Sequence, residues 1–247
     1  MSVRRYGDGD RHIVYFHGLG EAGGVFEPLL RERVLRDAEF THTVPDLPGY
    51  GRSTWPEPPL GLEAVADQLL AWLAGFPTPV VLVGHSMGGV LAVLVAEASP
   101  QAVKAIVNVE GNVSLDDCFM SGRIAAWDES NYAADGHEAI ARHLHSLAVD
   151  GSPESYHSAA FRFADPQSTY RHARDLVELS ATESLAERMA SLAVPCVFVA
   201  GVPRGIAPRS LELLDRHGVR TLRVAPSGHW VFWDQPAVCA EVVAELA

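Results

Sequence analysis

The sequence of 247 residues predicts an α/β fold with a mostly parallel sheet, helices on both faces of that sheet, and an all-helical insertion. Two observations lead to this prediction. Short apolar runs alternate with helix-length segments over most of the chain, and the alternation stops between residues 113 and 192. A chain of this length suits one domain that carries an inserted subdomain.

The predicted strands are short runs that are apolar throughout and that end near Gly, Pro or Asp. Such runs are typical of strands covered on both faces, because a strand with one wet face alternates apolar and polar residues. We therefore expect strands at 13–16, 42–47, 80–84, 105–109, 196–201 and 221–226.

The predicted helices fill the intervals between these strands. Alternation of strand and helix makes consecutive strands parallel and covers both faces of the sheet. The helix-length segments are 25–37, 61–75, 87–98, 207–217 and 231–246.

The interval 113–192 has no convincing strand pattern but carries signals for helix starts. Ser114 with Asp117 three residues later resembles a capping box. Asp165 followed by Pro166 is typical of an N-cap with proline at the first helical position. We therefore expect an all-helical insertion of roughly four helices.

Composition excludes several classes of partner. The formal net charge of -12 argues against nucleic acid and anionic membranes. The three cysteines are far apart and odd in number, so they indicate neither a disulfide framework nor a zinc site. No signal peptide or membrane-length apolar stretch is evident. We expect a cytoplasmic enzyme that acts on a small-molecule substrate without a metal or cofactor.

The strongest chemical signal is the stretch VVLVGHSMGGVLAVLVAEA at 80–98. It contains the pattern G-x-S-x-G around Ser86, between a predicted strand and a predicted helix, which is the context of a nucleophile elbow. The glycines leave room for a tight turn, and the helix N-terminus favours developing negative charge. We predict that Ser86 is a nucleophile; a structural glycine-rich turn is the alternative.

A serine hydroxyl needs a base to become a nucleophile, and the chain offers 11 histidines. His229 stands out because SGHW follows the predicted strand 221–226 directly. A loop at the carboxyl end of that strand faces the same edge of the sheet as Ser86. We predict that His229 is the base; a histidine on a surface loop is the alternative.

The stretch HGLGEAGG at 17–24 follows the first predicted strand. Its glycines let the backbone approach closely, so its N–H groups can point at an oxyanion. We expect the backbone N–H groups of Leu19 and Met87 to be the donors, and a plain strand-to-helix loop is the alternative. His17 is expected to brace this loop, and His85 to lie buried behind the nucleophile.

Together these motifs resemble the α/β-hydrolase superfamily. HGLGEAGG is similar to its oxyanion loop, GHSMGG to its nucleophile elbow, SGHW to its histidine loop, and DLPGYGRS (46–53) to the turn after its next strand. The resemblance implies an α/β-hydrolase core at 1–112 and 193–247, with a helical lid at 113–192. Only residues 1–12 precede the first predicted strand, so we expect the superfamily's leading antiparallel hairpin to be shortened.

The acid departs from the superfamily's usual place, which is after the strand that follows the lid. Here that strand is followed by VPRGIAP, and Arg204 stands near the expected position. Glu110 instead ends the strand before the lid, where some relatives, including many haloalkane dehalogenases, carry the acid. Because the base needs a carboxylate to orient it, we predict Glu110 for this role. A Ser–His dyad with water, or Asp128 reaching in from the lid, are the alternatives.

Substrate contacts are expected from side chains near these residues. Aromatic side chains could line an acyl pocket, although in a lid they more often pack between helices. Polar side chains near Glu110 could touch a polar substrate group. The predicted pocket residues are Asn112, Phe119, Arg123, Trp127 and Trp230.

The resemblance implies a serine hydrolase that cleaves a carboxylic ester, thioester or lactone through an acyl-enzyme on Ser86. A serine at this position argues against dehalogenase and epoxide hydrolase chemistry, which use an aspartate. The same residues would also serve C–C hydrolysis, acyl transfer or an elimination, because fold does not fix function. A non-catalytic, receptor-like binding protein is the remaining alternative, and the sequence names neither the substrate nor the oligomeric state.

Overall fold

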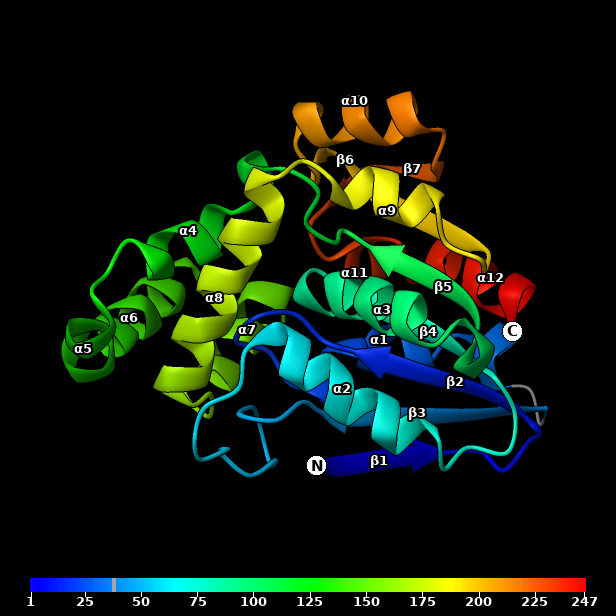
Figure 1. Ribbon diagram of the computed structural model, residues 1–247, viewed down its shortest axis with the longest axis horizontal. Helices are drawn as coiled ribbons and strands as arrows, with labels where there is room; N and C mark the ends of the chain where they lie inside the picture. Colours follow the sequence, from blue (N-terminus) through cyan, green and yellow to red (C-terminus); the bar gives the residue numbers. More distant parts are fainter. Residues whose placement is uncertain (37–38) are drawn as a thin grey trace.

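A seven-stranded sheet forms the centre of the molecule (Figure 1). The computed structural model describes residues 1–36 and 39–247. The strand order is β1-β3-β2-β4-β5-β6-β7, and all neighbouring pairs are parallel except β1 with β3. The strands are β1 (Ser2–Tyr6), β2 (Arg11–Phe16), β3 (Phe40–Asp46), β4 (Val80–His85), β5 (Val103–Val109), β6 (Cys196–Arg204) and β7 (Arg220–Gly228).

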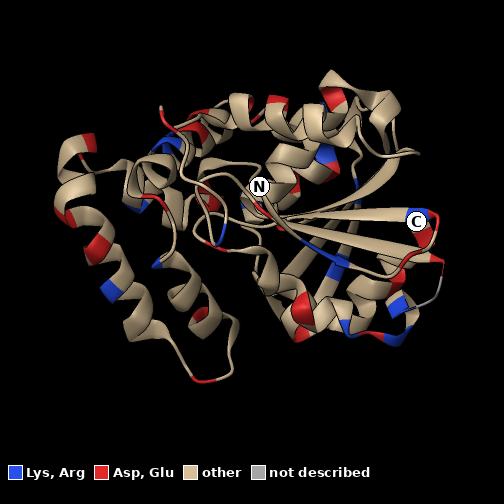
Figure 2. Cartoon of the chain, turned by 90° about the horizontal axis from the view of Figure 1, so that it is seen from below, with Lys and Arg blue, Asp and Glu red and all other residues tan. Residues whose placement is uncertain are grey.

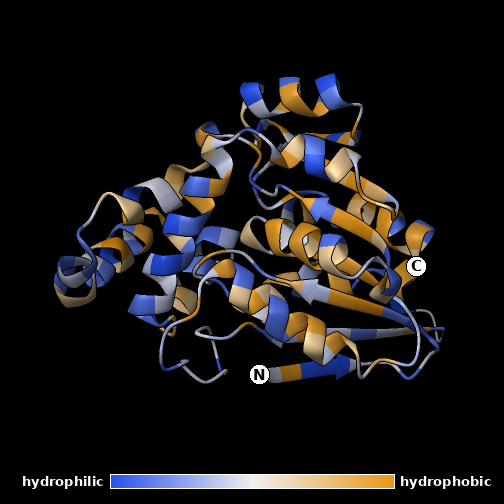
Figure 3. Cartoon of the chain, viewed as in Figure 1, coloured by the Kyte–Doolittle hydropathy of each residue, from blue (hydrophilic) through white to orange (hydrophobic). Residues whose placement is uncertain are grey.

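Helices cover both faces of this sheet, which is why central strands such as β4 are largely apolar and buried (Figure 3). In β6, Val197 packs toward one face, while the next residue, Phe198, packs toward the other. The first face carries α1 (Glu27–Leu30), α11 (Val231–Asp234) and α12 (Pro236–Leu246), and the second carries α2 (Leu62–Leu73), α3 (Met87–Ala98), α9 (Leu185–Ala190) and α10 (Pro208–His217).

The segment between β5 and β6 is helical in the structure. Its first turn, Leu115–Asp117, carries the predicted capping box at Ser114, and Asp165 caps the longest helix as predicted. The helices before α9 are α4 (Phe119–Ala125), α5 (Glu129–Asn131), the π-helical turn η5 (Tyr132–Gly136), α6 (His137–Leu147), α7 (Pro153–Phe161) and α8 (Pro166–Ala181).

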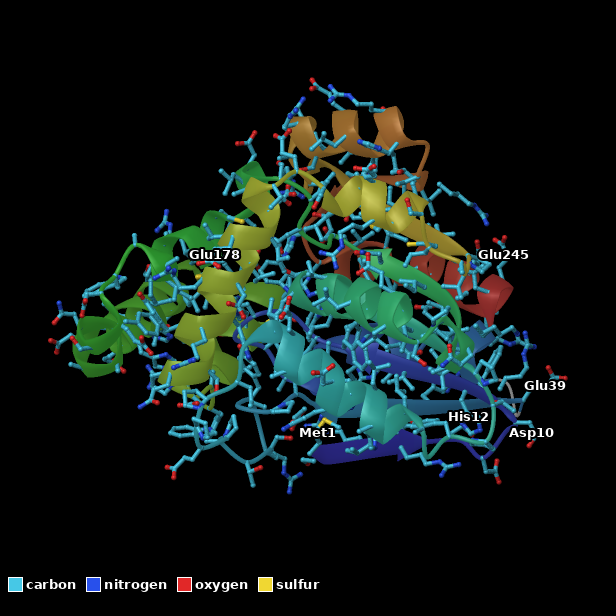
Figure 4. All side chains as sticks on the ribbon, in the orientation of Figure 1. Met1, Asp10, His12, Glu39, Glu178 and Glu245 are labelled. Atoms are coloured by element: carbon cyan, nitrogen blue, oxygen red, sulfur yellow. The ribbon has the colours of Figure 1, made fainter. Side chains whose placement is uncertain are left out.

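The helices α4 to α8 gather beyond the carboxyl ends of the strands, whereas α9 packs beside the sheet with α3 and α10 (Figure 1). The opposite end of the sheet carries Asp10, His12 and Glu39, far from these helices (Figure 4). The part of the insertion that stands over the carboxyl edge therefore ends with α8.

Two predicted helices differ from the structure, and the start of the sheet has one strand in place of a hairpin. The predicted helix 25–37 is three short pieces, η1 (Gly23–Phe26), α1 and η2 (Arg33–Arg36), and its last residue lies outside the described part. The predicted helix 231–246 is interrupted before Pro236, where proline lacks the N–H that a continuous helix needs. The expected shortening of the leading hairpin is seen as one strand, β1, which pairs antiparallel with β3.

Acidic and basic residues are interspersed over the surface of the helices (Figure 2). In the part of the chain that the structure describes, no helix combines the length and apolar character needed to cross a bilayer.

Candidate active site

Three of the predicted residues lie just beyond the carboxyl ends of parallel strands. Ser86 follows β4, Glu110 follows β5 and His229 follows β7. Parallel strands end at the same edge of a sheet, which is where open α/β sheets place their ligands. The structure therefore brings together residues that are far apart in the sequence.

Ser86 lies in a strained turn between β4 and α3. Its φ of 52° and ψ of -119° are rare for a residue with a side chain. A Cβ atom at Gly88 would come within 1.9 Å of the Phe16 carbonyl oxygen, so this turn requires glycine there. The Ser86 N–H donates to the Val109 carbonyl at 3.0 Å, which anchors the turn to β5.

Glu110 also has a positive φ, 56°, and its side chain is buried. Its Oε1 atom accepts the Gly201 N–H at 2.6 Å, and its Oε2 atom lies 3.3 Å from Nδ1 of His229. A Cβ atom on Gly205 would lie 2.7 Å from Oε1, so a glycine makes room for the carboxylate. Because an ionised carboxylate can only accept a hydrogen bond, Nδ1 of His229 is the donor in this contact. Nε2 is then the ring nitrogen that is free to take a proton.

Ser86 and His229 line the same small cavity, of about 30 Å³. Among the residues that the structure describes, no hydrogen bond joins their side chains; such bonds are often long without a substrate. The Phe119 ring stands edge-on to the His229 ring, with 5.4 Å between centroids. Phe119 therefore forms part of the cavity wall beside His229.

The loop after β2 is braced by His17, as predicted. The Leu47 N–H donates to Nε2 of His17 at 2.9 Å, so Nδ1 carries the proton and donates to the Gly18 carbonyl at 2.9 Å. Burial lowers the pKa of His17, which keeps this ring neutral. Leu19 lines the cavity, and Met87 is the first residue of α3, where N–H groups precede the helical ladder.

A second buried network, which the sequence analysis missed, lies beside the cavity. Glu21 accepts the Gly18 N–H at 2.7 Å, Nδ1 of His85 at 3.0 Å and Nε1 of Trp230 at 2.6 Å. Burial alone would raise the pKa of Glu21, but His85 and the other neighbouring donors hold it well below its usual range. A charged residue inside a glycine-rich loop was the one sequence signal that pointed to this network.

His157 on α7 is the second residue that the sequence analysis missed. It is buried, lines the cavity, and donates from Nε2 to the Leu19 carbonyl at 3.0 Å. Burial lowers its pKa, so the neutral form is favoured. No sequence signal separated it from the other histidines of the insertion, because its importance comes only from where α7 packs.

The predicted pocket residues divide into two groups. Asn112, Phe119 and Trp230 line the cavity. Arg123 is exposed and donates to Nε2 of His143 at 2.9 Å, away from the cavity. Trp127 packs among the helices of the insertion, where a Cβ atom on Gly136 would touch its ring.

Asp128, the alternative acid, and Arg204, which stands near the usual acid position, do not line the cavity. Asp128 is exposed and caps α5 by accepting the N–H groups of Ser130 and Asn131. Arg204 is the last residue of β6 and is exposed. In the described ranges, 1–36 and 39–247, no group of three or more His, Cys, Asp or Glu side chains could hold a metal ion.

Known proteins share this sequence pattern over most of the chain. Residues 13–242 match the alpha/beta hydrolase family. The pimeloyl-[acyl-carrier protein] methyl ester esterase of Klebsiella pneumoniae is 27% identical over 251 residues, which are 97% of this chain and 95% of that protein. Lipase LipV of Mycobacterium tuberculosis is 36% identical over 118 residues, but the alignment covers only 47% of this chain and 43% of the lipase.

Solved structures share the fold. A thermophilic esterase from Thermogutta terrifontis matches with a TM-score of 0.78 at 22% identity, over 99% of this chain and 91% of that one. Est816, an N-acyl homoserine lactone degrading enzyme, matches with a TM-score of 0.74 at 19% identity, over 100% and 96%. Because the family match covers residues 13–242, the chain belongs to the alpha/beta hydrolase family.

Proposed function

We propose that this protein is a serine hydrolase that cleaves a carboxylic ester, thioester or lactone through an acyl-enzyme on Ser86. One observation carries the proposal. Ser86 and His229 share a cavity, and Nδ1 of His229 faces the buried carboxylate of Glu110. Esterase and lactonase names among the similar proteins support the same reaction class.

In the proposed reaction, Oγ of Ser86 attacks the carbonyl carbon while Nε2 of His229 takes the hydroxyl proton. Glu110 holds the ring and stabilises the imidazolium that forms. The backbone N–H groups of Leu19 and Met87 donate to the developing oxyanion. His229 then protonates the leaving group, and water activated by the same nitrogen releases the acid and restores Ser86.

We further propose that the inserted segment 113–192 acts as a lid, mainly through its part before α9. That part supplies Phe119 from α4 and His157 from α7 to the cavity. Residues of this segment would then set the substrate range.

A reporter ester tests the reaction class. The purified protein is assayed with p-nitrophenyl acetate, a thioester and a lactone, beside Ser86→Ala. We expect Ser86→Ala to lower turnover by several orders of magnitude while the far-UV circular dichroism spectrum stays unchanged. A serine-directed fluorophosphonate should label Ser86 in the wild type; turnover by Ser86→Ala at the wild-type rate contradicts the proposal.

A further inference from the structure

We propose that Glu21 and His85 form a buried ion pair that positions the oxyanion loop and the His229 loop for catalysis. This inference rests on the function proposed above and adds two positioning residues to it. Both side chains are almost inaccessible to solvent, at 2% for Glu21 and 1% for His85. Both act through their neighbours, because the atoms that react in the proposed mechanism belong to other residues.

The hydrogen-bond partners of His85 indicate that its ring is doubly protonated. Nδ1 faces Oε2 of Glu21 at 3.0 Å, and Nε2 faces the backbone carbonyl oxygen of His229 at 3.2 Å. A carbonyl oxygen can only accept, and an ionised carboxylate can only accept. Both ring nitrogens are therefore donors, and the imidazolium charge lies against the carboxylate charge.

Both oxygens of the Glu21 carboxylate accept hydrogen bonds. The backbone N–H of Gly18 donates to Oε2 at 2.7 Å, and Nε1 of Trp230 donates to Oε1 at 2.6 Å. N–H donors on both oxygens favour the ionised form. A Cβ atom on Gly18 would lie 2.9 Å from Oε2, so the loop is packed directly onto the carboxylate.

Through these contacts the pair joins three segments that the proposed reaction uses. Gly18 precedes Leu19 in the oxyanion loop, and His85 precedes Ser86. Trp230 follows His229, and the carbonyl that His85 holds belongs to His229 itself. The ion pair at this junction therefore holds the oxyanion donors, the nucleophile and the base at fixed positions relative to one another.

A neutral amide cannot replace this carboxylate. In Glu21→Gln, one of the two oxygens becomes an NH₂ group. If it replaces Oε2, it opposes the Gly18 N–H; if it replaces Oε1, it opposes the Trp230 N–H. Either orientation sets two donors against each other and weakens one of the links.

Other titratable groups also face the pair. His157 approaches from α7, His229 from the loop after β7, and His17 from the end of β2. Tyr156 also interacts with Glu21, and Asp46 interacts with His17. Burial lowers the pKa values of His17 and His157, so both of these rings are neutral in neutral solution. The contacts of His85, in contrast, require a positive charge on its ring.

Nitrogen-15 NMR of the full chain with labelled histidine tests the ionic state without any substrate. The His85 signals are assigned by their loss in His85→Gln. At pH 7 we expect both His85 ring nitrogens to carry a proton in the wild type, and one of them to lose it in Glu21→Gln. A neutral His85 ring in the wild type overturns the ion pair.

Steady-state kinetics with a short-chain p-nitrophenyl ester test the positioning role. We expect Glu21→Gln to lower kcat by about 10- to 100-fold, less than the loss of an oxyanion donor itself, with KM within about threefold. Asp165→Asn is the matched control, because Asp165 is another buried carboxylate that accepts N–H groups. Its two backbone donors belong to the start of α8, away from the oxyanion loop and His229. We expect its kcat to stay near the wild-type value.

The outcomes separate this inference from the proposed function. If turnover depends on Ser86 but Glu21→Gln keeps the kcat of the Asp165→Asn control, the positioning role is wrong and the serine hydrolase stands. If Ser86→Ala turns over the ester normally, both are wrong. If Glu21→Gln does not fold, Trp230→Phe removes the N–H donated to Oε1 together with part of the ring, and an unchanged kcat in that variant overturns the positioning role.

Discussion

Nδ1 of His229 lies 3.3 Å from Oε2 of Glu110, and the other oxygen of the same carboxylate accepts the Gly201 N–H at 2.6 Å. The carboxylate is therefore held from β6 while it faces the loop after β7. This arrangement explains how a strand that precedes the insertion can supply the acid. The position after β6 then no longer needs a carboxylate, and exposed Arg204 stands near it.

Glu110→Gln should abolish most activity while leaving the fold intact. The Gly201 N–H keeps the amide oxygen on its own side, so the NH₂ group must face His229. That NH₂ group can only donate, which makes Nδ1 the acceptor and moves the proton to Nε2, the nitrogen that should act as the base. We expect kcat to fall by up to about 10⁴-fold, measured with a reporter ester beside Asp128→Asn.

Asp128 was the alternative acid, and its exposed position at the start of α5 makes Asp128→Asn a matched control. We expect that control to turn over at the wild-type rate. Normal activity in Glu110→Gln, or a large loss in Asp128→Asn, would show that Glu110 is not the group that orients the base.

Phe119→Ala should shift the preference toward longer acyl chains. The ring stands over His229 and lines the cavity, so its removal makes room for additional methylene groups. Each buried methylene contributes about 0.8 kcal/mol, so the butyrate-to-acetate ratio of kcat/KM should rise by roughly tenfold. The measurement is kcat/KM for a series of p-nitrophenyl esters.

Phe163→Ala is the control for that series, because Phe163 is also exposed on the inserted segment but does not line the cavity. We expect its acyl-chain preference to match the wild type. Equal shifts in both variants would mean that the inserted segment does not form the acyl pocket.

The contact between His172 on α8 and Tyr50 should make the protein sensitive to acid. The Tyr50 hydroxyl lies 2.7 Å from Nδ1 of His172, and burial lowers the pKa of His172 to about 3. The unfolded chain therefore binds this proton near pH 6.5, while the folded chain binds it only near pH 3. The stability contribution is complete above about pH 6.5 and is lost as the pH falls toward 3.

Urea unfolding at pH 7.5, 6 and 5 measures this effect. His172→Gln removes the titrating ring, so its free energy of unfolding should fall less between pH 7.5 and 5 than that of the wild type. His17 and His157 have pKa values lowered in the same direction, but they are present in both proteins and cancel in the comparison. Parallel pH dependences in the two proteins would refute the assignment to His172.

The sequence predicted the sheet well because fully covered strands leave an uninterrupted apolar run. It also placed Ser86, Glu110 and His229 at one edge, because residues that directly follow parallel strands share that edge. β1 was not predicted as a strand, since SVRRY has little apolar character and lies at the edge of the sheet. The segment 25–37 was predicted as one helix, although it is several short pieces, because apolar content alone does not show where helical hydrogen bonds end.

The part of the site that depends on packing could not be predicted. Arg123 and Trp127 are near Glu110 in the sequence, but Arg123 on α4 faces solvent, and Trp127, which follows α4, packs among the inserted helices. Glu21 and His157 meet the site through tertiary contacts with Trp230 and Leu19, which no local pattern encodes. Patterns along the chain locate strand ends, whereas contacts between helices appear only in three dimensions.

The acyl-enzyme is the central claim, and mass spectrometry of a trapped intermediate tests it most directly. The protein is mixed with p-nitrophenyl acetate, quenched in acid within the first turnovers, digested and analysed for a peptide that has gained one acetyl group. The account predicts that the acetyl group is on Ser86, and that Ser86→Ala yields no acetylated peptide and no turnover. An acetyl group on another residue, or turnover by Ser86→Ala at the wild-type rate, would contradict it.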